Sequence, residues 1–236
     1  MSKPKTRYWL LVPLVAAAIY AFYECGYRSR EFWGYYRFLL NEPPIWDATP
    51  EQEQVVRAAF RVPQRGVIEA VLAVTVAEHL LDYCSEEERA AYASAGVGGL
   101  CTESGEVFVK AQYISPQVLF HEFVHAAVYA TPRKEEFAWR WSEICPEKTY
   151  LGKAWIDMSP DDALRECFLE PRAAMSMDED VAIFGQELLF FLSNTDTYDG
   201  PLRGPFGKAP CWGKMADVFL DFRFIDASQR STFDAR

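Results

Sequence analysis

The sequence has no excess of basic residues, no closely spaced cysteine pairs and few histidines. Its 236 residues include 24 lysines and arginines against 34 aspartates and glutamates, so the net charge is −10 at pH 7. This balance argues against binding to nucleic acid through a basic surface. Six cysteines are present, but no two form a C-x-x-C pair, which argues against a zinc site made of cysteines.

Long apolar runs are also missing, with one exception near the N-terminus. The segment Tyr8–Tyr27 carries one charged residue, Glu24, and has about the 20 residues needed to cross a bilayer as a helix. Tyrosine and tryptophan gather toward its two ends, as they do at membrane interfaces. We therefore expect an N-terminal transmembrane helix within residues 1–30, a juxtamembrane segment and linker over 31–48, and one domain over 49–236.

Two other interpretations of the N-terminus remain open. A signal peptide could be cleaved after Ala16-Ala17-Ala18, or the segment could be an ordinary buried helix. An anchor leaves a single-pass membrane protein whose domain is extracytoplasmic, and cleavage leaves a secreted one. Either position permits disulfides, and a Cys84–Cys101 bridge across the glycine-rich loop 96–99 is one plausible pair.

Two of only three histidines stand four residues apart, in His121-Glu122-Phe123-Val124-His125. Ser115-Pro116 before this motif is typical of a helix start, and Thr131-Pro132 after it is typical of a helix end. On a helix, both imidazoles lie on one face and can reach one metal ion. Glu122 then lies beside the ion, where it can accept a proton from a metal-bound water.

A catalytic zinc ion needs a third protein ligand and one open position. No histidine follows His125, and His79 resembles an ordinary surface or core-edge histidine, so the third ligand is expected to be a carboxylate. Ser159-Pro160 predicts the start of another helix, in which Glu166 and Glu170 would share one face. Glu166 is our first candidate for the third ligand; Glu143 and Glu170 remain alternatives.

The strand-like segment Glu106–Lys110, followed by the motif helix, resembles the zincin family of metallopeptidases. The segment Asp161–Glu170 resembles the glutamate-bearing helix of gluzincins, most closely that of the anthrax-lethal-factor-like peptidases. The resemblance implies an α+β, zincin-like fold, mainly helical, with a small sheet beside the motif helix. It implies that Glu166 completes the zinc site, that Glu170 supports it, and that the strand 106–110 borders the cleft.

These features predict a membrane-anchored, zinc-dependent metallopeptidase. His121, His125 and Glu166 would bind Zn²⁺, and Glu122 would act as the base in the hydrolysis of a peptide or protein substrate. The expected partners are that substrate and, through the N-terminal helix, the membrane. Two alternatives are a catalytically silent, zinc-containing binding domain and, if the N-terminus is cleaved, a secreted zinc hydrolase.

Overall fold

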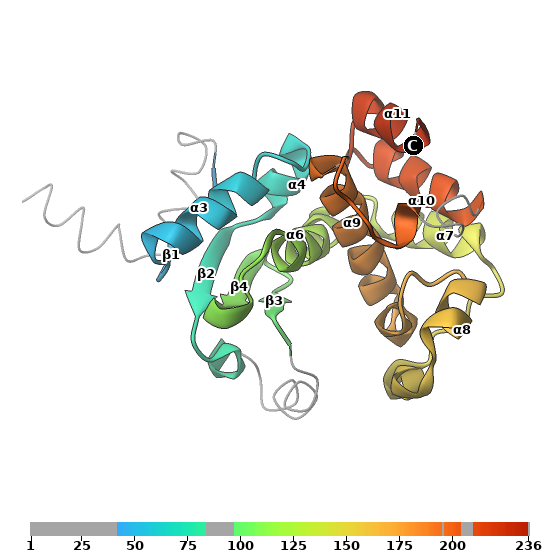
Figure 1. The fold of residues 1–236 in the computed structure, drawn as a ribbon, viewed down its shortest axis with the longest axis horizontal. Helices are drawn as coiled ribbons and strands as arrows, with labels where there is room; N and C mark the ends of the chain where they lie inside the picture. The colour runs from blue at the N-terminus through green and yellow to red at the C-terminus, as the bar shows by residue number, and fades with distance from the viewer. Residues whose placement is uncertain (1–41, 84–96, 195, 204–209, 236) are drawn as a thin grey trace, which may run out of the picture. The chain divides into compact units, whose positions relative to one another are not determined.

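The computed structural model describes residues 42–83, 97–194, 196–203 and 210–235 (Figure 1). The chain divides into two units, Met1–Pro44 and Ile45–Arg236, and every element named below belongs to the second. No helix among the described residues is long and apolar enough to cross a membrane. The expected anchor, Tyr8–Tyr27, and Cys84 of the suggested disulfide lie outside the described residues.

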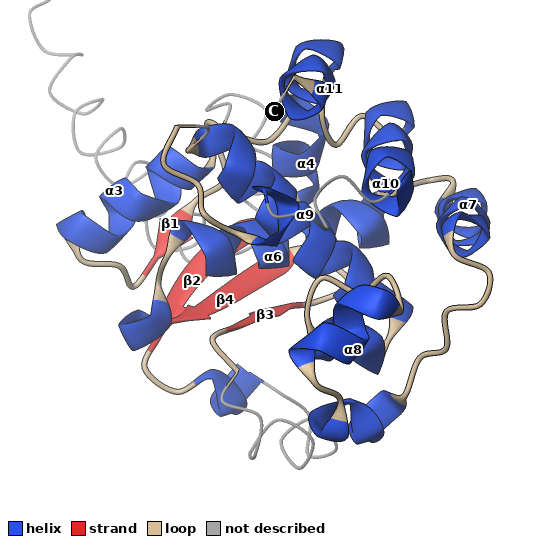
Figure 2. Ribbon diagram, turned by 45° about the vertical axis from the view of Figure 1, so that its right-hand side comes forward, coloured by secondary structure: helices blue, strands red, loops and turns tan. Residues whose placement is uncertain are grey.

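The strands form one small sheet in the order β1–β2–β4–β3 (Figure 2). Strands β1 (Ile45–Trp46), β2 (Ala73–Ala77) and β4 (Glu106–Lys110) run parallel to one another, whereas β3 (Gly99–Cys101) is antiparallel to β4. Within the part of the chain that the structure describes, β3 is therefore an edge strand and β4 an inner one. The predicted strand 106–110 and the α+β class are confirmed.

The apolar pattern of residues 67–93 predicts mainly helix, and the structure differs from this at β2. A short helix, α4 (Arg65–Ala70), is followed by β2, whose five residues are all buried. A strand buried on both faces shows a continuous apolar run, and periodicity cannot distinguish such a run from a buried helix. The helix α3 (Pro50–Ala59) begins as expected, with the Thr49 side chain accepting a hydrogen bond from the Gln52 amide.

The motif helix α6 (Pro116–Ala130) is the centre of the domain. The Ser115 hydroxyl caps its first turn by accepting from the Val118 amide, as the sequence predicted. Ten consecutive residues of α6, Leu119–Val128, are buried, because α6 packs against β3, β4, α3 and α4 as well as α9 (Met177–Ser193). Helix α6 lies between the sheet and α9 (Figure 1).

The packing of α6 on α9 is unusually close at one glycine. A β-carbon at Gly185 of α9 would lie 2.5 Å from a methyl carbon of Val124 on α6 and 2.9 Å from the Phe219 ring. Distances this short are not compatible with a side chain. The glycine therefore lets the two helices approach to the spacing that the structure has.

The remaining elements cover the other side of α9. They are α7 (Lys134–Ile144), α8 (Pro160–Arg165), α10 (Pro210–Asp221), α11 (Ala227–Asp234) and the 3-10 helices η4 (Gly152–Asp157) and η5 (Pro171–Met175). Phe137, Trp141, Phe184 and Phe219 form an aromatic core between these helices, with ring centroids 4.9–5.9 Å from neighbouring aromatic rings.

Helix α8 is shorter than predicted, and this separates Glu166 from Glu170. The Phe168 amide donates to the Ala163 carbonyl at 2.8 Å, and the Cys167 amide donates to the Leu164 carbonyl at 3.4 Å. Cys167 itself has a φ of +62°. This is the Schellman ending of a helix, with Cys167 at the left-handed position where glycine is usual. The prediction that Glu166 and Glu170 share a helix face is therefore wrong.

Candidate metal centre

Three ligand atoms from two helices converge beside the motif. The Nε2 atoms of His121 and His125 are 3.2 Å apart. The carboxylate of Glu179 on α9 lies 3.5 Å from His121 Nε2 through Oε2, and 3.7 Å from His125 Nε2 through Oε1. Donors about 2.0–2.1 Å from a tetrahedral zinc ion are about 3.3 Å from one another. The three side chains thus fit one such ion with small adjustments.

The polar atoms of this group are poorly satisfied by the protein alone. His121 and His125 are only 4% and 8% exposed. Two Nε2 atoms that face each other can share one hydrogen bond at most, and the buried Glu179 Oε2 has an ion pair with Arg172 but accepts no hydrogen bond among the described residues. Buried polar atoms are normally paired. A cation between the three side chains would satisfy all of them.

The charges at the centre also suit a metal ligand set. Burial lowers the pKa of His121 to about 4, against the opposing effect of Glu179, so this imidazole is neutral at pH 7. Glu179 has a lowered pKa, because hydrogen bonding to His121 and His125 and the charge of Arg172 outweigh its burial. A neutral imidazole and an ionised carboxylate are the protonation states that bind metals. Burial lowers the pKa of His125, but Glu179 and Glu122 raise it above its ordinary value, so this ring would release a proton on binding a metal.

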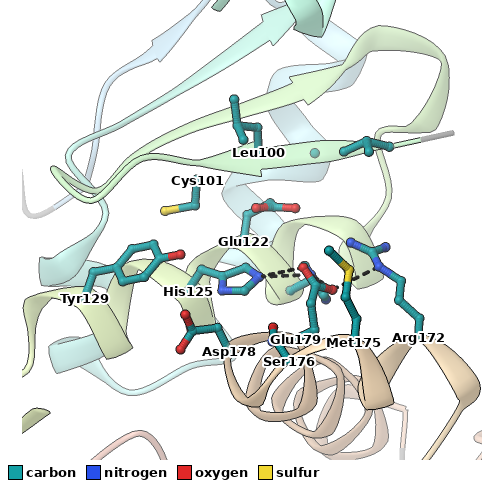
Figure 3. A pocket seen from close by; sticks show the side chains of 13 residues that line it. Leu100, Cys101, Glu122, His125, Tyr129, Arg172, Met175, Ser176, Asp178 and Glu179 are labelled. Carbon is teal, nitrogen blue, oxygen red and sulfur yellow. Dashed lines mark hydrogen bonds and ion pairs between the residues drawn. The ribbon is translucent and has the colours of Figure 1, made fainter. Parts of the chain in front are cut away.

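Glu179 reaches the histidines because it stands in the first turn of α9. The Ser176 hydroxyl caps this helix by accepting from the Glu179 amide at 3.2 Å. The helix dipole favours an anion at this end. Arg172 of η5 forms an ion pair with Glu179, with Nε 2.9 Å from Oε2, and lies on the side of the carboxylate opposite the histidines (Figure 3).

The structure does not bring Glu166 to this group. Glu166 is exposed at the C-terminal end of α8, and Glu143 is exposed on α7. The expectation that Glu166 joins the two histidines is therefore wrong, because Glu166 lies exposed at the end of α8; the carboxylate that the structure places beside them is that of Glu179. His79 is exposed, as expected of an ordinary surface histidine.

Glu170, the residue expected to support the site, lies near the converging ligands but is not one of them. Partial burial raises its pKa, while the charge of Arg172 opposes this and the charge of Glu179 adds to it. Glu170 is thus close enough to Arg172 and Glu179 to influence them electrostatically. It is not one of the three converging ligands.

Glu122, the expected base, is buried beside the two histidines. It is 4% exposed, and burial raises its pKa from 4.5 to about 7, with the charge of His125 opposing the increase. Strand β3 lies very close to the Glu122 side chain, because a β-carbon at Gly99 would be only 2.6 Å from Glu122 Oε1. Only a glycine leaves room for the carboxylate at this point of the edge strand.

A cavity of about 170 Å³ opens onto the centre. Leu100 and Cys101 lie on one side of this cleft, and Ser176, Asp178 and Glu179 lie on the other (Figure 3). The cleft is lined by Val97, Gly99, Leu100, Cys101, His121, Glu122, His125, Tyr129, Arg172, Met175, Ser176, Asp178 and Glu179. The strand that borders it is therefore β3 and not β4, which corrects the expectation for 106–110.

Polar groups other than Glu122 also face this cleft. Tyr129 stacks on the His125 ring with centroids 5.9 Å apart, and Arg172 lies next to Glu179. Of two other tyrosines near the motif in the sequence, Tyr113 is 45% exposed, and the Tyr150 hydroxyl donates to Asp180 at 3.0 Å. Neither lines the cleft.

Comparisons of the chain with models of protein families, with curated proteins and with solved structures find no match. The interpretation of the site therefore depends on its own geometry and chemistry.

Proposed function

We propose that this chain is a zinc-dependent metallopeptidase with a zincin-like domain of the gluzincin type. His121, His125 and Glu179 hold the metal ion, and Glu122 is the catalytic base. One observation carries the proposal: three ligand side chains converge at the wall of a cleft that a buried glutamate also lines, with 3.2 Å between the two Nε2 atoms and 3.5 and 3.7 Å from these atoms to the Glu179 oxygens. Three ligands plus a base are typical of a catalytic zinc site.

Zinc, when bound, supplies the Lewis acidity that makes water nucleophilic near neutral pH. Glu122 accepts the proton of the attacking water and passes it to the leaving amine. A pKa of about 7 suits this two-way transfer, because a base works best when its pKa is near the working pH. Tyr129 and Arg172 are the side chains in the cleft that can donate to a developing oxyanion.

The edge strand favours a peptide as the substrate. Within the described residues, β3 pairs with β4 on one side only, and its other side borders the cleft. An extended peptide can add to such an edge through main-chain hydrogen bonds. Gly99 brings the edge close to Glu122, so a peptide bound there would present its carbonyl next to the base.

The rival function is a catalytically silent zinc-containing binding domain. Structural zinc sites are usually closed by four protein ligands. Three ligands converge in the described residues, and the remaining side faces Glu122 and the cleft, which favours chemistry. The membrane anchor, the extracytoplasmic position of the domain and the secreted alternative remain predictions from the sequence.

The test combines metal analysis with a peptide cleavage assay on the full chain. The wild-type protein should contain zinc and cleave members of an unbiased peptide mixture. Glu122→Gln should keep the zinc and lose at least about a hundredfold in cleavage rate, the usual scale for a general base. Glu166→Gln, an exposed former candidate, is the matched control and should behave as wild type. A zinc-replete Glu122→Gln protein that cleaves at the wild-type rate would contradict the mechanism.

A further inference from the structure

A second group of metal-binding side chains lies outside the cleft. The sulfur atoms of Cys145, Cys167 and Cys211 all lie within 4.8 Å of one another, and all three are free thiols. They come from separate parts of the chain. Cys145 ends α7, Cys167 follows α8, and Cys211 is in the first turn of α10. None of them lines the cleft of the histidine centre.

The backbone at Cys167 gives independent support for a functional group here. Its φ of +62° is in the left-handed region, which costs a residue with a side chain roughly 1–2 kcal/mol relative to the right-handed conformation. At this position of a Schellman motif, glycine avoids the cost. Cysteine adds a thiol, and the backbone there brings that thiol next to the other two. Strained backbone of this kind is concentrated at sites with a function.

We propose that Cys145, Cys167 and Cys211 bind a second metal ion, a thiophilic cation of which Zn²⁺ is the example. Zinc–sulfur bonds of about 2.3 Å place the sulfurs of a tetrahedral site about 3.8 Å apart. The observed grouping within 4.8 Å requires only a small contraction to reach this geometry. Thiolates are the ligands that select such soft cations.

The charges around the cluster favour thiolates bound to a cation. Three thiolates around a divalent ion leave one negative charge, and the Lys148 ammonium acts electrostatically on both Cys145 and Cys167. The nearby Asp180 carboxylate accepts from Lys148 at 2.6 Å, Trp141 at 2.8 Å and Tyr150 at 3.0 Å. Asp180 is thus engaged as an acceptor, so this carboxylate is not free to act as a base beside the ion.

A metal explains the trio better than a disulfide does. A disulfide would join two of the sulfurs and leave the third thiol packed against the bond. A metal ion would be bound by all three sulfur atoms. It would fasten the end of α7, the turn after α8 and the start of α10 to one point, across a region that contains several short 3-10 helices.

The test uses the full chain, purified under reducing conditions and loaded with Co²⁺ in place of zinc. Thiolate ligands give cobalt an intense charge-transfer absorption in the near ultraviolet, whereas histidine and carboxylate ligands do not. Wild-type protein should show this band, and Cys145→Ser and Cys167→Ser should each lose it together with one equivalent of metal. Cys101→Ser removes the thiol that lines the histidine cleft and should keep the band; loss of the band in this variant would place the thiolate at the histidine centre and overturn the proposal.

The proposal can fail independently of the proposed function. His121→Ala should keep the thiolate–cobalt band, because that variant disrupts only the other centre. Absence of the band in cobalt-loaded wild-type protein would overturn the cysteine site, whatever the peptidase assay shows, and needs no variant to fold. A disulfide between two of the three cysteines in natively purified protein, found by mass spectrometry of unreduced peptides, would also overturn it.

Discussion

The histidine centre and the cysteine cluster both bring three ligand side chains together, but they differ in how far apart these residues are in the sequence. His121 and His125 are neighbours on one turn of α6, and only Glu179 has to be brought from elsewhere. The three cysteines come from three separate segments. The histidine centre opens onto a cleft and has the buried Glu122 beside it, whereas the cysteines of the cluster do not line that cleft. The comparison therefore sets a proposed site for chemistry against a proposed site that joins separate segments.

The two groups meet at the first turn of α9. Glu179 faces the histidines, and the next residue, Asp180, holds Lys148 beside the cysteines. Neighbouring helical residues point in different directions, so a single turn serves both groups. Anything that shifts this turn is therefore expected to be felt at both places.

The largest expected effect is the loss of metal from one group while the other group keeps its metal. Glu179→Ala should remove metal from the histidine centre and abolish peptide cleavage, because two imidazoles alone cannot complete the site. The same variant should leave the thiolate–cobalt band in place, and Cys167→Ser should do the reverse. Metal content and the cobalt spectrum measure both outcomes. If Glu166→Ala, and not Glu179→Ala, releases the metal, the assignment of Glu179 is wrong.

The next effect concerns Gly99, where β3 touches the base. Gly99→Ala should lower the peptide cleavage rate by about a hundredfold with zinc retained, because an added methyl would displace the Glu122 carboxylate. Gly98→Ala is the matched control. Its added carbon would have its nearest contact at an ordinary 3.4 Å, from Tyr113, and no charged group is involved. Equal rates in the two variants would refute a role for the close contact at Gly99.

The metal-free protein should show a dependence on pH that is due to Glu122. The folded state raises its pKa from 4.5 to about 7, so its contribution to stability is present below pH 4.5 and is lost as the pH rises through 7. Wild type should therefore lose stability relative to Glu122→Gln between about pH 5 and about pH 8. The difference is at most about 3 kcal/mol, at about 1.4 kcal/mol for each unit of pKa. Denaturant unfolding in the presence of a chelator measures it, and a difference that is independent of pH would contradict the burial of an ionisable Glu122.

The smallest expected effect is at Glu170. Its charge acts on Arg172 and Glu179 without direct coordination. Glu170→Gln should weaken zinc binding by about tenfold or less, near the lower limit for residues that support a metal site from outside. Competition with a chelator gives the affinity. A loss as large as that of Glu179→Ala would make Glu170 a ligand.

Local sequence patterns predicted the part of the site that lies on one element. Ser115-Pro116 and Thr131-Pro132 set the ends of α6, and the spacing of four set both imidazoles on one face. The strand Glu106–Lys110 was also readable from its alternation. Each of these depends on residues close in sequence, where propensity and periodicity act directly.

The carboxylate that lies beside the two histidines, that of Glu179, could not be predicted from a local pattern in the same way. The helix end at Cys167 was hidden because cysteine occupies a position where glycine is the usual mark. Glu179 did have a local mark: Ser176-x-x-Glu179 is typical of a helix start. That pattern predicts where α9 begins, but it does not predict that the start of α9 lies against α6. The meeting of α9 with α6 depends on tertiary packing over more than fifty residues of chain.

Gly185 would let the hydrophobic core influence the proposed metal centre, although the glycine contributes no ligand. It lies six residues after Glu179, about 9 Å along α9, and it sets how closely α9 approaches α6 at Val124. The gap between these helices is also the gap that the ion must span. A methyl group at this position would act as a wedge that widens the site while all ligands are kept. If the proposed centre binds an ion, the size of ion that it accepts would depend partly on the absence of a side chain inside the hydrophobic core.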